Sequence, residues 1–369
     1  MGGTPKLTVA SLFCGVGGMD LGFEWAGCEI AWASDFSPAA INSYKLNFGI
    51  APILADISEL SVSAIPATDV IIGGPPCQSF SLAGKRRPDD PRGKLVYRFV
   101  EIIRQKLPSA FVMENVPGLS SSKIDGRSLS DVLEEQFEAM GYRVRQMHLN
   151  AIDYLVPQRR KRLVLVGSSI KRPPLPDGRV FAKTFYNIVR SDYDRSAAAA
   201  LGDLGPCPAK GMRSRYRDAA PSQFASLMRY KSGYDVSLHQ CPRMSDTDRL
   251  LVAHIPPGGN YNDVPDDISS ARIMNHKETG QRTTAYGRLH PRRPSYTINA
   301  NFRRPNVGCN FHYSELRLIT PREAMRLQSL PDHFELQYKN QDERNALIGN
   351  AVPPLMAQAI AWSVMQALA

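Results

Sequence analysis

Residues 7–27 read LTVASLFCGVGGMDLGFEWAG, a short apolar run that passes through a glycine-rich turn into a segment with helical spacing. An apolar run of this length predicts a buried strand. The glycines that follow allow the backbone to approach a ligand closely at the start of the next helix. The segment therefore predicts the first strand, turn and helix of an α/β sheet, although a tight connection that binds nothing would have the same pattern.

The same alternation of β-branched runs and helical segments continues to residue 167. Further strands are expected at residues 29–35, 70–74, 110–116, 142–149 and 162–167, and helices at residues 19–26, 38–48, 96–106 and 129–140. Six strands connected in this way predict a doubly wound, Rossmann-like α/β fold with helices on both faces of a parallel sheet.

The character of the sequence changes after residue 167. A proline-rich segment, KRPPLPDG at residues 171–178, precedes a long stretch with weak periodicity and clustered basic residues. Residues 210–231 hold six Lys or Arg and one acid, and residues 288–304 hold five Arg and no acid. Such clusters are typical of a surface that meets a polyanion, and a solvated basic loop is the alternative.

Helical spacing returns at residues 320–328 and 353–368. The length of the chain favours one large domain with a second, smaller one. We therefore expect a first domain of residues 1–180 plus 314–369, with the C-terminus returning to it, and a second domain of residues 181–313.

Composition limits the classes of protein. The 369-residue chain has a formal charge of +10, which fits a nucleic-acid partner but also a mildly basic enzyme without one. The six cysteines form no C-x-x-C pair and the seven histidines show no metal-ligand spacing, so neither a metal site nor a disulfide framework is expected. No run reaches the roughly 18 apolar residues of a membrane span, and no leader-like segment is present, so we expect a cytoplasmic protein.

A cysteine stands in the segment GGPPCQSFS at residues 73–81, directly after the third expected strand. Ligands bind at this carboxyl edge of such a sheet. The two prolines restrict the backbone before Cys77, so its sulfur could be held ready to attack a substrate. A lone cysteine in a turn is more often structural, and the basic segment 81–93 after it is either a mobile lid or a solvated loop.

Three further groups of polar residues follow strands. Glu114 ends a buried strand, where desolvation would favour a protonated carboxyl that donates a proton; a capping carboxylate is the alternative. In QRRKR at residues 158–162, alternation along a strand would point Arg160 and Arg162 the same way, as in a phosphate clamp or a solvated basic run. Asp35 ends the second strand, where a carboxylate can bind ribose hydroxyls or simply be solvated.

Taken in order, these segments resemble the motifs of the cytosine-5 DNA methyltransferase family, of the bacterial restriction-modification type. The matching motifs, from the first strand to the last helix, are FxGxGG at 13–18, PPCQ at 75–78, ENV at 114–116, QxRxR at 158–162, TPREAMRLQ at 320–328 and GNAVPP at 349–354. Segments 253–260, 287–291 and 295–298 are similar to parts of members' recognition regions. Asp35 stands where many members carry Glu and Ala351 where many carry Ser, which bears on cofactor affinity.

The resemblance implies that S-adenosylmethionine is the cofactor, with S-adenosylhomocysteine as product. Residues implied to bind it are Phe13, Gly15, Gly17, Gly18, Asp35, Phe36, Asp56, Ile57, Pro76, Leu95, Asn350 and Val352. Cys77 is implied to add to carbon 6 of cytosine, Glu114 to act at ring N3 and Arg162 at the exocyclic oxygen, with Arg160 nearby. DNA contacts are implied for Gln78, Ser81, Lys85 and Arg92.

The implied partner is double-stranded DNA, from which one cytosine is rotated out of the stack to be methylated. We expect a monomer, with a cognate restriction endonuclease, if present, acting separately. Three alternatives remain open: a methyltransferase of transfer RNA, a catalytically silent DNA-binding module, and a nicotinamide-dependent oxidoreductase. The long basic insert and the absence of a Cys-Phe-Thr tripeptide from residues 181–313 argue against the first, and the Cys77, Glu114 and Arg162 set argues against the second.

Overall fold

The computed structural model describes residues 6–76, 91–124, 126–208, 214–217 and 222–369, with the side chains of residues 91–93 left out. The chain divides into two compact units. The first takes in the chain up to Tyr154, Lys161–Tyr186 and Pro354–Ala369, and the second takes in Leu155–Arg160 and Asn187–Pro353.

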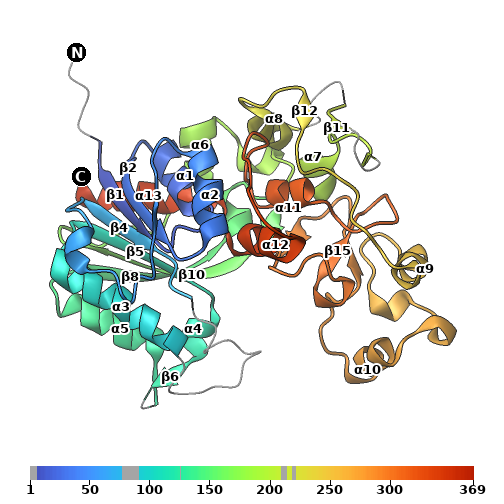
Figure 1. Cartoon of the computed structure of the whole chain (residues 1–369), viewed down its shortest axis with the longest axis horizontal. Coiled ribbons are helices and arrows are strands. Elements are labelled where there is room, and N and C mark those ends of the chain that lie inside the picture. Colours follow the sequence, from blue (N-terminus) through green and yellow to red (C-terminus); the bar gives the residue numbers. More distant parts are fainter. Residues whose placement is uncertain (1–5, 77–90, 125, 209–213, 218–221) are drawn as a thin grey trace. The chain divides into compact units, whose positions relative to one another are not determined.

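The first unit is built on a seven-stranded sheet in the order β3-β2-β1-β4-β5-β10-β8 (Figure 1). Its strands are β1 (Thr8–Leu12), β2 (Glu29–Asp35), β3 (Ile53–Leu54), β4 (Val70–Gly73), β5 (Ala110–Asn115), β8 (Arg143–Asn150) and β10 (Lys161–Ser168). Strand order runs outward in both directions from β1 and β4, which confirms the doubly wound α/β fold. The expectation of an all-parallel sheet is wrong at one edge, because β10 pairs antiparallel with both β5 and β8.

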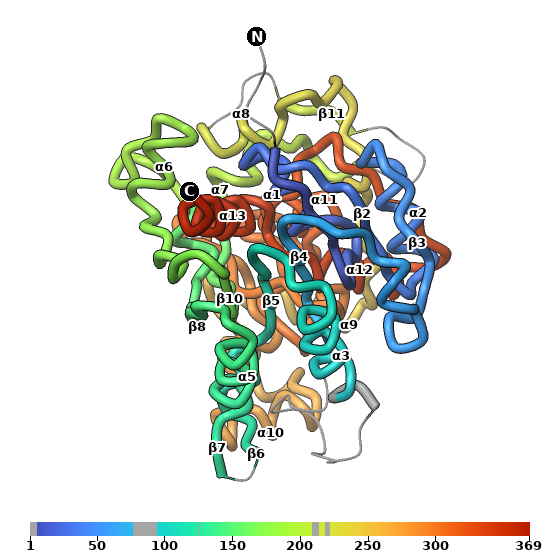
Figure 2. Tube along the Cα trace, turned by 90° about the vertical axis from the view of Figure 1, so that its left-hand side faces the viewer, coloured from blue at the N-terminus to red at the C-terminus, as the bar shows by residue number. Residues whose placement is uncertain are grey.

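Helices cover both faces of this sheet. They are α1 (Gly18–Trp25), α2 (Pro38–Asn47), α3 (Pro91–Lys106), α4 (Gly118–Ser121), α5 (Leu129–Glu138), α6 (Gly178–Tyr186) and α13 (Pro354–Leu368). Short elements of the same unit are η1 (Val62–Ala64), β6 (Lys123–Ile124), β7 (Arg127–Ser128) and η3 (Ala151–Tyr154). Figure 2 shows α1 and α13 on one side of the central strands, and α3 and α5 on the other.

The core of the first unit forms where α3 and α5 pack on the sheet. The ring of Phe111 on β5 lies 4.1 Å from that of Phe137 on α5 and 6.5 Å from that of Phe99 on α3, measured between centroids. All three are fully buried, and each buried aromatic of this size stabilises the fold by about 2–3 kcal/mol. Alternating apolar strands and amphipathic helices thus produce the layered packing that the sequence predicts.

The C-terminal helix belongs to the same core. Gly22 of α1 packs directly against the backbone of α13, since a Cβ at this position would come within 2.5 Å of the Pro354 carbonyl oxygen. Among the described residues one run, Gln341–Leu368, is apolar enough to pass for a membrane span, but 89% of its most apolar window is buried inside the structure. This burial is the behaviour of a helix within a folded core.

The second unit has little regular structure. Its elements are β9 (Gln158–Arg159), η4 (Arg190–Asp192), α7 (Ala197–Leu201), β11 (Ser214–Arg215), α8 (Gln223–Arg229), β12 (Asp235–Val236), α9 (Asp246–His254), η5 (Tyr261–Asp263), η6 (Asp266–Ile268), α10 (Ala271–Thr279), β13 (Gly287–Arg288), β14 (Ser295–Tyr296), η7 (Pro305–Val307), β15 (Cys309–Phe311), α11 (Pro321–Leu327) and α12 (Gln341–Asn350). Sheets in its described part have two strands each.

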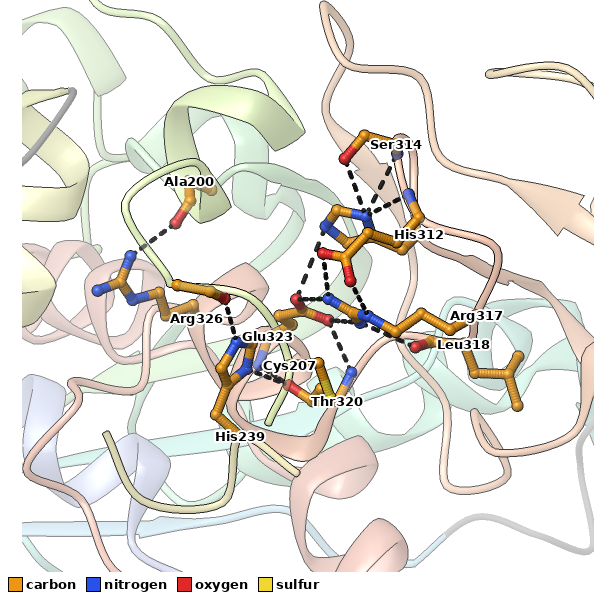
Figure 3. A network of polar contacts seen from close by, with 12 residues as sticks. Ala200, Cys207, His239, His312, Ser314, Arg317, Leu318, Thr320, Glu323 and Arg326 are labelled. Atoms are coloured by element: carbon orange, nitrogen blue, oxygen red, sulfur yellow. Dashed lines mark hydrogen bonds and ion pairs between the residues drawn. The ribbon is translucent and has the colours of Figure 1, made fainter. Parts of the chain in front are cut away.

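Buried ion pairs organise this second unit. Arg326 on α11 is fully buried between the carboxylates of Asp203 and Asp332. It also donates to the Ala200 carbonyl at 3.0 Å, the contact that Figure 3 shows. Asp203 precedes residue 314 and Arg326 follows it, so this ion pair joins residues 314–353 to the second unit. Only α13, from Pro354, returns to the first unit, which differs from the expected boundary at residue 314.

A second buried cluster surrounds Glu323, also on α11. Its carboxylate accepts two hydrogen bonds from Arg317 at 2.8 Å, and its other neighbours are His312 and the backbone of Thr320 (Figure 3). Burial alone would raise the pKa of Glu323, but the Arg317 guanidinium outweighs it and lowers that pKa to about 2. The pair therefore stays charged in the interior.

The structure also joins two cysteines. Cys207 and Cys241 form a disulfide, with Cα atoms 5.3 Å apart and a separation of 34 positions in sequence. The sequence analysis, which expected no disulfide framework, missed this pair, because a C-x-x-C search detects only close neighbours in sequence. The other cysteines in the described part of the chain, Cys14, Cys28 and Cys309, are free and buried.

We expect Arg326→Met to lower the free energy of unfolding by about 3–5 kcal/mol, because it leaves two buried carboxylates without their main partner. Arg127→Met is the matched control, since Arg127 pairs with Glu135 at the surface with both side chains more than half exposed, and it should cost less than about 1 kcal/mol. Urea denaturation of both variants measures the difference. Equal losses would show that the buried pair does not hold the second unit together.

Candidate functional site

The register of the sheet brings three strand ends together. Leu12 of β1 lies beside Gly73 of β4, and Gly73 lies beside Met113 of β5. The residues that follow, among them Phe13 and Glu114, therefore meet at the carboxyl edge, next to the point where strand order reverses. Ligands bind at this place in open α/β sheets.

The glycine-rich turn after β1 is open on one side and packed on the other. Gly15 adopts a φ of +56°, and a Cβ there would meet no atom within 4 Å. Gly17 has a φ of +87°, and a Cβ there would overlap the rings of Phe48 and Tyr44 at 2.3 and 2.9 Å. The backbone at Gly15 can thus approach a ligand, while Gly17 packs the turn against Tyr44 and Phe48. Gly18 begins α1.

Asp35, at the end of β2, holds this turn in place. Its Oδ2 accepts a hydrogen bond from the Gly15 backbone N–H at 2.9 Å, and its Oδ1 accepts one from the Ser37 N–H at 2.9 Å. Burial raises the pKa of Asp35, and the hydrogen bonds from Ser37 and Gly15 partly offset this. Ribose binding by Asp35 stays a prediction, and the structure adds a bond to the turn that the sequence did not reveal.

Other residues expected to bind the cofactor lie around the same strand ends. Phe13 and Leu95 pack, partly buried, against the core cluster that contains Ile57. Phe36, beside Asp35, is 71% exposed. An open turn, a carboxylate at a strand end and nearby apolar side chains suit an adenosine-containing cofactor, whose ribose is polar and whose base is flat and apolar.

Asp56 is exposed, and its carboxylate accepts two hydrogen bonds from Ser58, at 2.9 Å from the backbone N–H and 2.6 Å from the hydroxyl. These bonds lower the pKa of Asp56. The carboxylate is therefore charged near neutral pH, at the start of the segment that carries Ile57.

Glu114 is held by Arg162. The Arg162 Nε lies 2.7 Å from the Glu114 Oε1, and each side chain is only 12% exposed. The pairing of β10 with β5 creates this contact, because Leu163 lies opposite Asn115. The same carboxylate borders the loop after β4, since a Cβ at Gly74 would lie 3.2 Å from the Glu114 Oε2.

Asn115 ties down the same loop, which the sequence did not predict. Its buried Nδ2 donates to the Pro75 carbonyl at 3.0 Å, and its Oδ1 accepts from the Val116 N–H at 2.9 Å. The backbone that leads through Pro76 is therefore anchored to the end of β5. Its position next to Glu114 in the ENV motif was the available signal.

Several expected site residues lie outside the described part of the chain. Cys77, Gln78, Ser81 and Lys85 are among them, and Arg92 is described only as part of the α3 backbone. Pro76 is the last described residue before Cys77. Among the described residues, no group of His, Cys, Asp or Glu side chains is arranged to hold a metal ion.

Arg160 and Arg162 do not share one strand face as expected. Strand β9 ends at Arg159 and β10 begins at Lys161, so the alternation is broken at Arg160, which belongs to the second unit. The Arg160 guanidinium is 1% exposed and donates to the carbonyls of Ile298, Gly349 and Ala351 at 2.9–3.1 Å. It thereby fixes the segment that carries Asn350 and Val352, and its expected role in catalysis stays a prediction.

Comparisons with known proteins agree on one family. The model of the C-5 cytosine-specific DNA methylases matches residues 7–366. The Type II methyltransferase M.NgoFVII of Neisseria gonorrhoeae is 32% identical over 365 residues, covering 98% of this chain and 87% of that protein. M1.HphI of Haemophilus parahaemolyticus is also 32% identical, with 98% and 87% covered.

Solved structures show the same fold. A prophage-encoded Escherichia coli protein, described as a DNA modification methyltransferase, aligns with a TM-score of 0.71 at 23% identity over 98% of this chain and 99% of its own. The Dnmt2 methyltransferase of S. pombe aligns with a TM-score of 0.62 at 17% identity over 98% of this chain and 99% of its own. At these identities the likeness concerns the fold.

We expect Gly17→Ala to lower the free energy of unfolding by about 3 kcal/mol, because its Cβ is forced into two packed rings at a left-handed φ. Gly15→Ala should cost only about 1 kcal/mol, since it meets open space and carries the backbone strain alone. Urea denaturation of both variants provides the measurement. Similar losses for the two would show that the turn is not seated on Tyr44 and Phe48.

Proposed function

The chain belongs to the C-5 cytosine-specific DNA methylases, and from that premise we propose that it transfers the methyl group of S-adenosylmethionine to carbon 5 of a cytosine in a specific duplex DNA sequence. One observation carries the proposal: Glu114, held by Arg162, borders the anchored backbone that leads to Cys77. A nicotinamide-dependent reaction is inconsistent with membership of this family.

The cofactor would occupy the carboxyl edge of the first unit. The turn from Phe13 to Gly18 would approach it at Gly15, Asp35 would bind the ribose, and Phe36, Asp56, Ile57 and Leu95 would surround the adenine. Asn350 and Val352, for which the resemblance also implies cofactor binding, lie in the second unit, where Arg160 is the positioning residue that fixes their segment. When bound, S-adenosylmethionine supplies an electrophilic methyl group.

Cys77 is the nucleophile in this proposal. Its thiolate would form a bond to carbon 6 of cytosine, and the electron pair of the ring double bond would shift toward carbon 5, which becomes nucleophilic. After methylation, loss of the carbon-5 proton restores the double bond and expels the cysteine thiolate. The thiol is thus regenerated, and one proton is released for each methyl group transferred.

Glu114 and Arg162 would act on the other side of the ring. A carboxyl at ring N3 can donate a proton or a hydrogen bond as charge develops there. Arg162 fixes Glu114 through Nε and donates through NH1 to the Lys161 carbonyl at 2.8 Å. Its NH2 forms no hydrogen bond to another described residue, which leaves a donor for the exocyclic oxygen.

The second unit would hold the DNA while the cytosine is rotated out of the stack, at a cost of about a few kcal/mol that contacts to the duplex offset. Not every arginine expected there can take part. Arg288 is buried and donates to the carbonyls of His312 and Ile255, and Arg303 pairs with Asp342. Arg292, Arg293 and Arg304 are exposed and are the better candidates for contacts to phosphates or guanine.

Gln78, Ser81, Lys85 and Arg92 would contact DNA from the loop after Cys77. We propose that the protein acts as a monomer in the cytoplasm, where bacterial DNA lies, and that any cognate restriction endonuclease acts separately. The names of the relatives, which are Type II methyltransferases, support a role in restriction and modification.

Duplex DNA with 5-fluorocytosine in mixed sequence contexts should form a covalent adduct that survives a denaturing gel, because fluorine at carbon 5 cannot leave as a proton does. The adduct should require both S-adenosylmethionine and Cys77, so Cys77→Ser and a duplex with ordinary cytosine serve as controls. An adduct on RNA alone would favour a transfer-RNA substrate. No adduct on either polymer would favour a silent DNA-binding module.

Glu114→Gln should reduce methyl transfer by about 10²- to 10⁴-fold, because an amide cannot donate a proton to ring N3. Binding of the cofactor should remain within about twofold of wild type. Glu135→Gln, which removes a surface carboxylate of the first unit, should leave the rate unchanged. A rate measured in a single turnover tests this, and a nearly normal rate for Glu114→Gln would remove Glu114 from the reaction.

A further inference from the structure

A buried carboxyl lies beneath the glycine-rich turn and takes no part in the reaction proposed above. Asp20, in the first turn of α1, is fully buried. Its Oδ1 accepts a hydrogen bond from the Tyr44 hydroxyl at 2.9 Å, and the nearby Ser11 hydroxyl also stabilises the charged carboxylate. These partners are neutral, so the burial of the charge is compensated only in part.

The Asp20–Tyr44 pair contacts the turn directly. The Tyr44 ring stacks on Phe48 with centroids 4.1 Å apart, and these are the two rings on which Gly17 is seated. Tyr44 itself is fully buried. A change at Asp20 is therefore transmitted to the turn both through this packing and through its charge.

Two carboxylates act on the turn at once. Burial raises the pKa of the Cys14 thiol well above its usual range, and the negative charges of Asp20 and Asp35 raise it further. Cys14 is the second residue of the turn, so both charges reach its interior. Within the described residues, no Lys, Arg or His forms an ion pair with either carboxylate.

The groups around Asp20 do not supply a positive charge. They are the Ser11 hydroxyl from β1, Tyr44 from α2, the Cys14 thiol from the turn and Glu24 from α1 itself. Helix α13, which packs on α1, carries no titratable side chain. Burial raises the pKa of Asp20 to about 6, so the group is mostly ionised at pH 7.

We propose that Asp20, held by Tyr44, provides a fixed negative charge beneath the turn that raises the affinity of the site for a cationic ligand relative to its neutral counterpart. The inference rests on the proposed cofactor: S-adenosylmethionine carries a sulfonium charge that S-adenosylhomocysteine lacks. A charge in a buried, low-dielectric setting discriminates between two such ligands without touching either.

Isothermal titration of both ligands tests this without measuring methyl transfer. Asp20→Asn, which keeps the shape and removes the charge, should reduce the preference for S-adenosylmethionine over S-adenosylhomocysteine about fivefold, corresponding to about 1 kcal/mol. The affinity for S-adenosylhomocysteine should stay within about twofold, which also shows that the variant is folded. Glu24→Gln is the matched control, because it removes an exposed carboxylate from the same helix, and it should leave the preference unchanged.

The wild-type protein provides a second measurement that needs no variant. Because Asp20 takes up a proton as the pH falls through about 6, the preference should be full at pH 7.5 and decline toward pH 5. In Asp20→Asn the preference should depend less on pH, which distinguishes the titration of Asp20 from that of Asp35. A preference that changes neither with pH nor in Asp20→Asn would overturn the inference and leave the proposed function intact. If neither ligand binds, the proposed cofactor itself is contradicted.

Discussion

The ion pair between Glu114 and Arg162 is the contact on which the candidate site depends. It exists only because β10 lies antiparallel between β5 and β8, in a register that places Leu163 opposite Asn115. A shift of one residue would turn Arg162 to the other face of the sheet and leave Glu114 without a partner. Asn115 on the same strand end anchors Pro75, so one strand end fixes both the acid and the loop toward Cys77.

Buried charge has a different use in each unit. In the second unit, which has few regular elements, Arg326 and Glu323 are compensated by partners inside the same unit, and their burial specifies how the irregular chain packs. Beneath the turn of the first unit, Asp20 and Asp35 have no basic partner among the described residues. A charge that the fold leaves uncompensated is a reason to look for a ligand that compensates it.

The sequence predicted the elements whose information is local. The apolar run and glycines of residues 7–18 define β1 and its turn, and ENV identified Glu114. Arrangement across the sheet was harder, because periodicity does not reveal that β10 inserts antiparallel. The alternation rule was wrong for Arg160 because it assumes an unbroken strand. The disulfide was missed because Cys207 and Cys241 are 34 positions apart in sequence. Asp20 resembled an ordinary acid of a first helical turn, because its contact with Tyr44 is not visible in the local sequence.

The central claim is that this chain methylates carbon 5 of cytosine in DNA, and analysis of the product tests it most directly. Duplex DNA of mixed sequence would be incubated with the protein and S-adenosylmethionine that carries a labelled methyl group, then digested to nucleosides and examined by mass spectrometry. The account predicts label in 5-methylcytosine alone. Label on an exocyclic nitrogen of cytosine or adenine, or incorporation into RNA but not DNA, would contradict it.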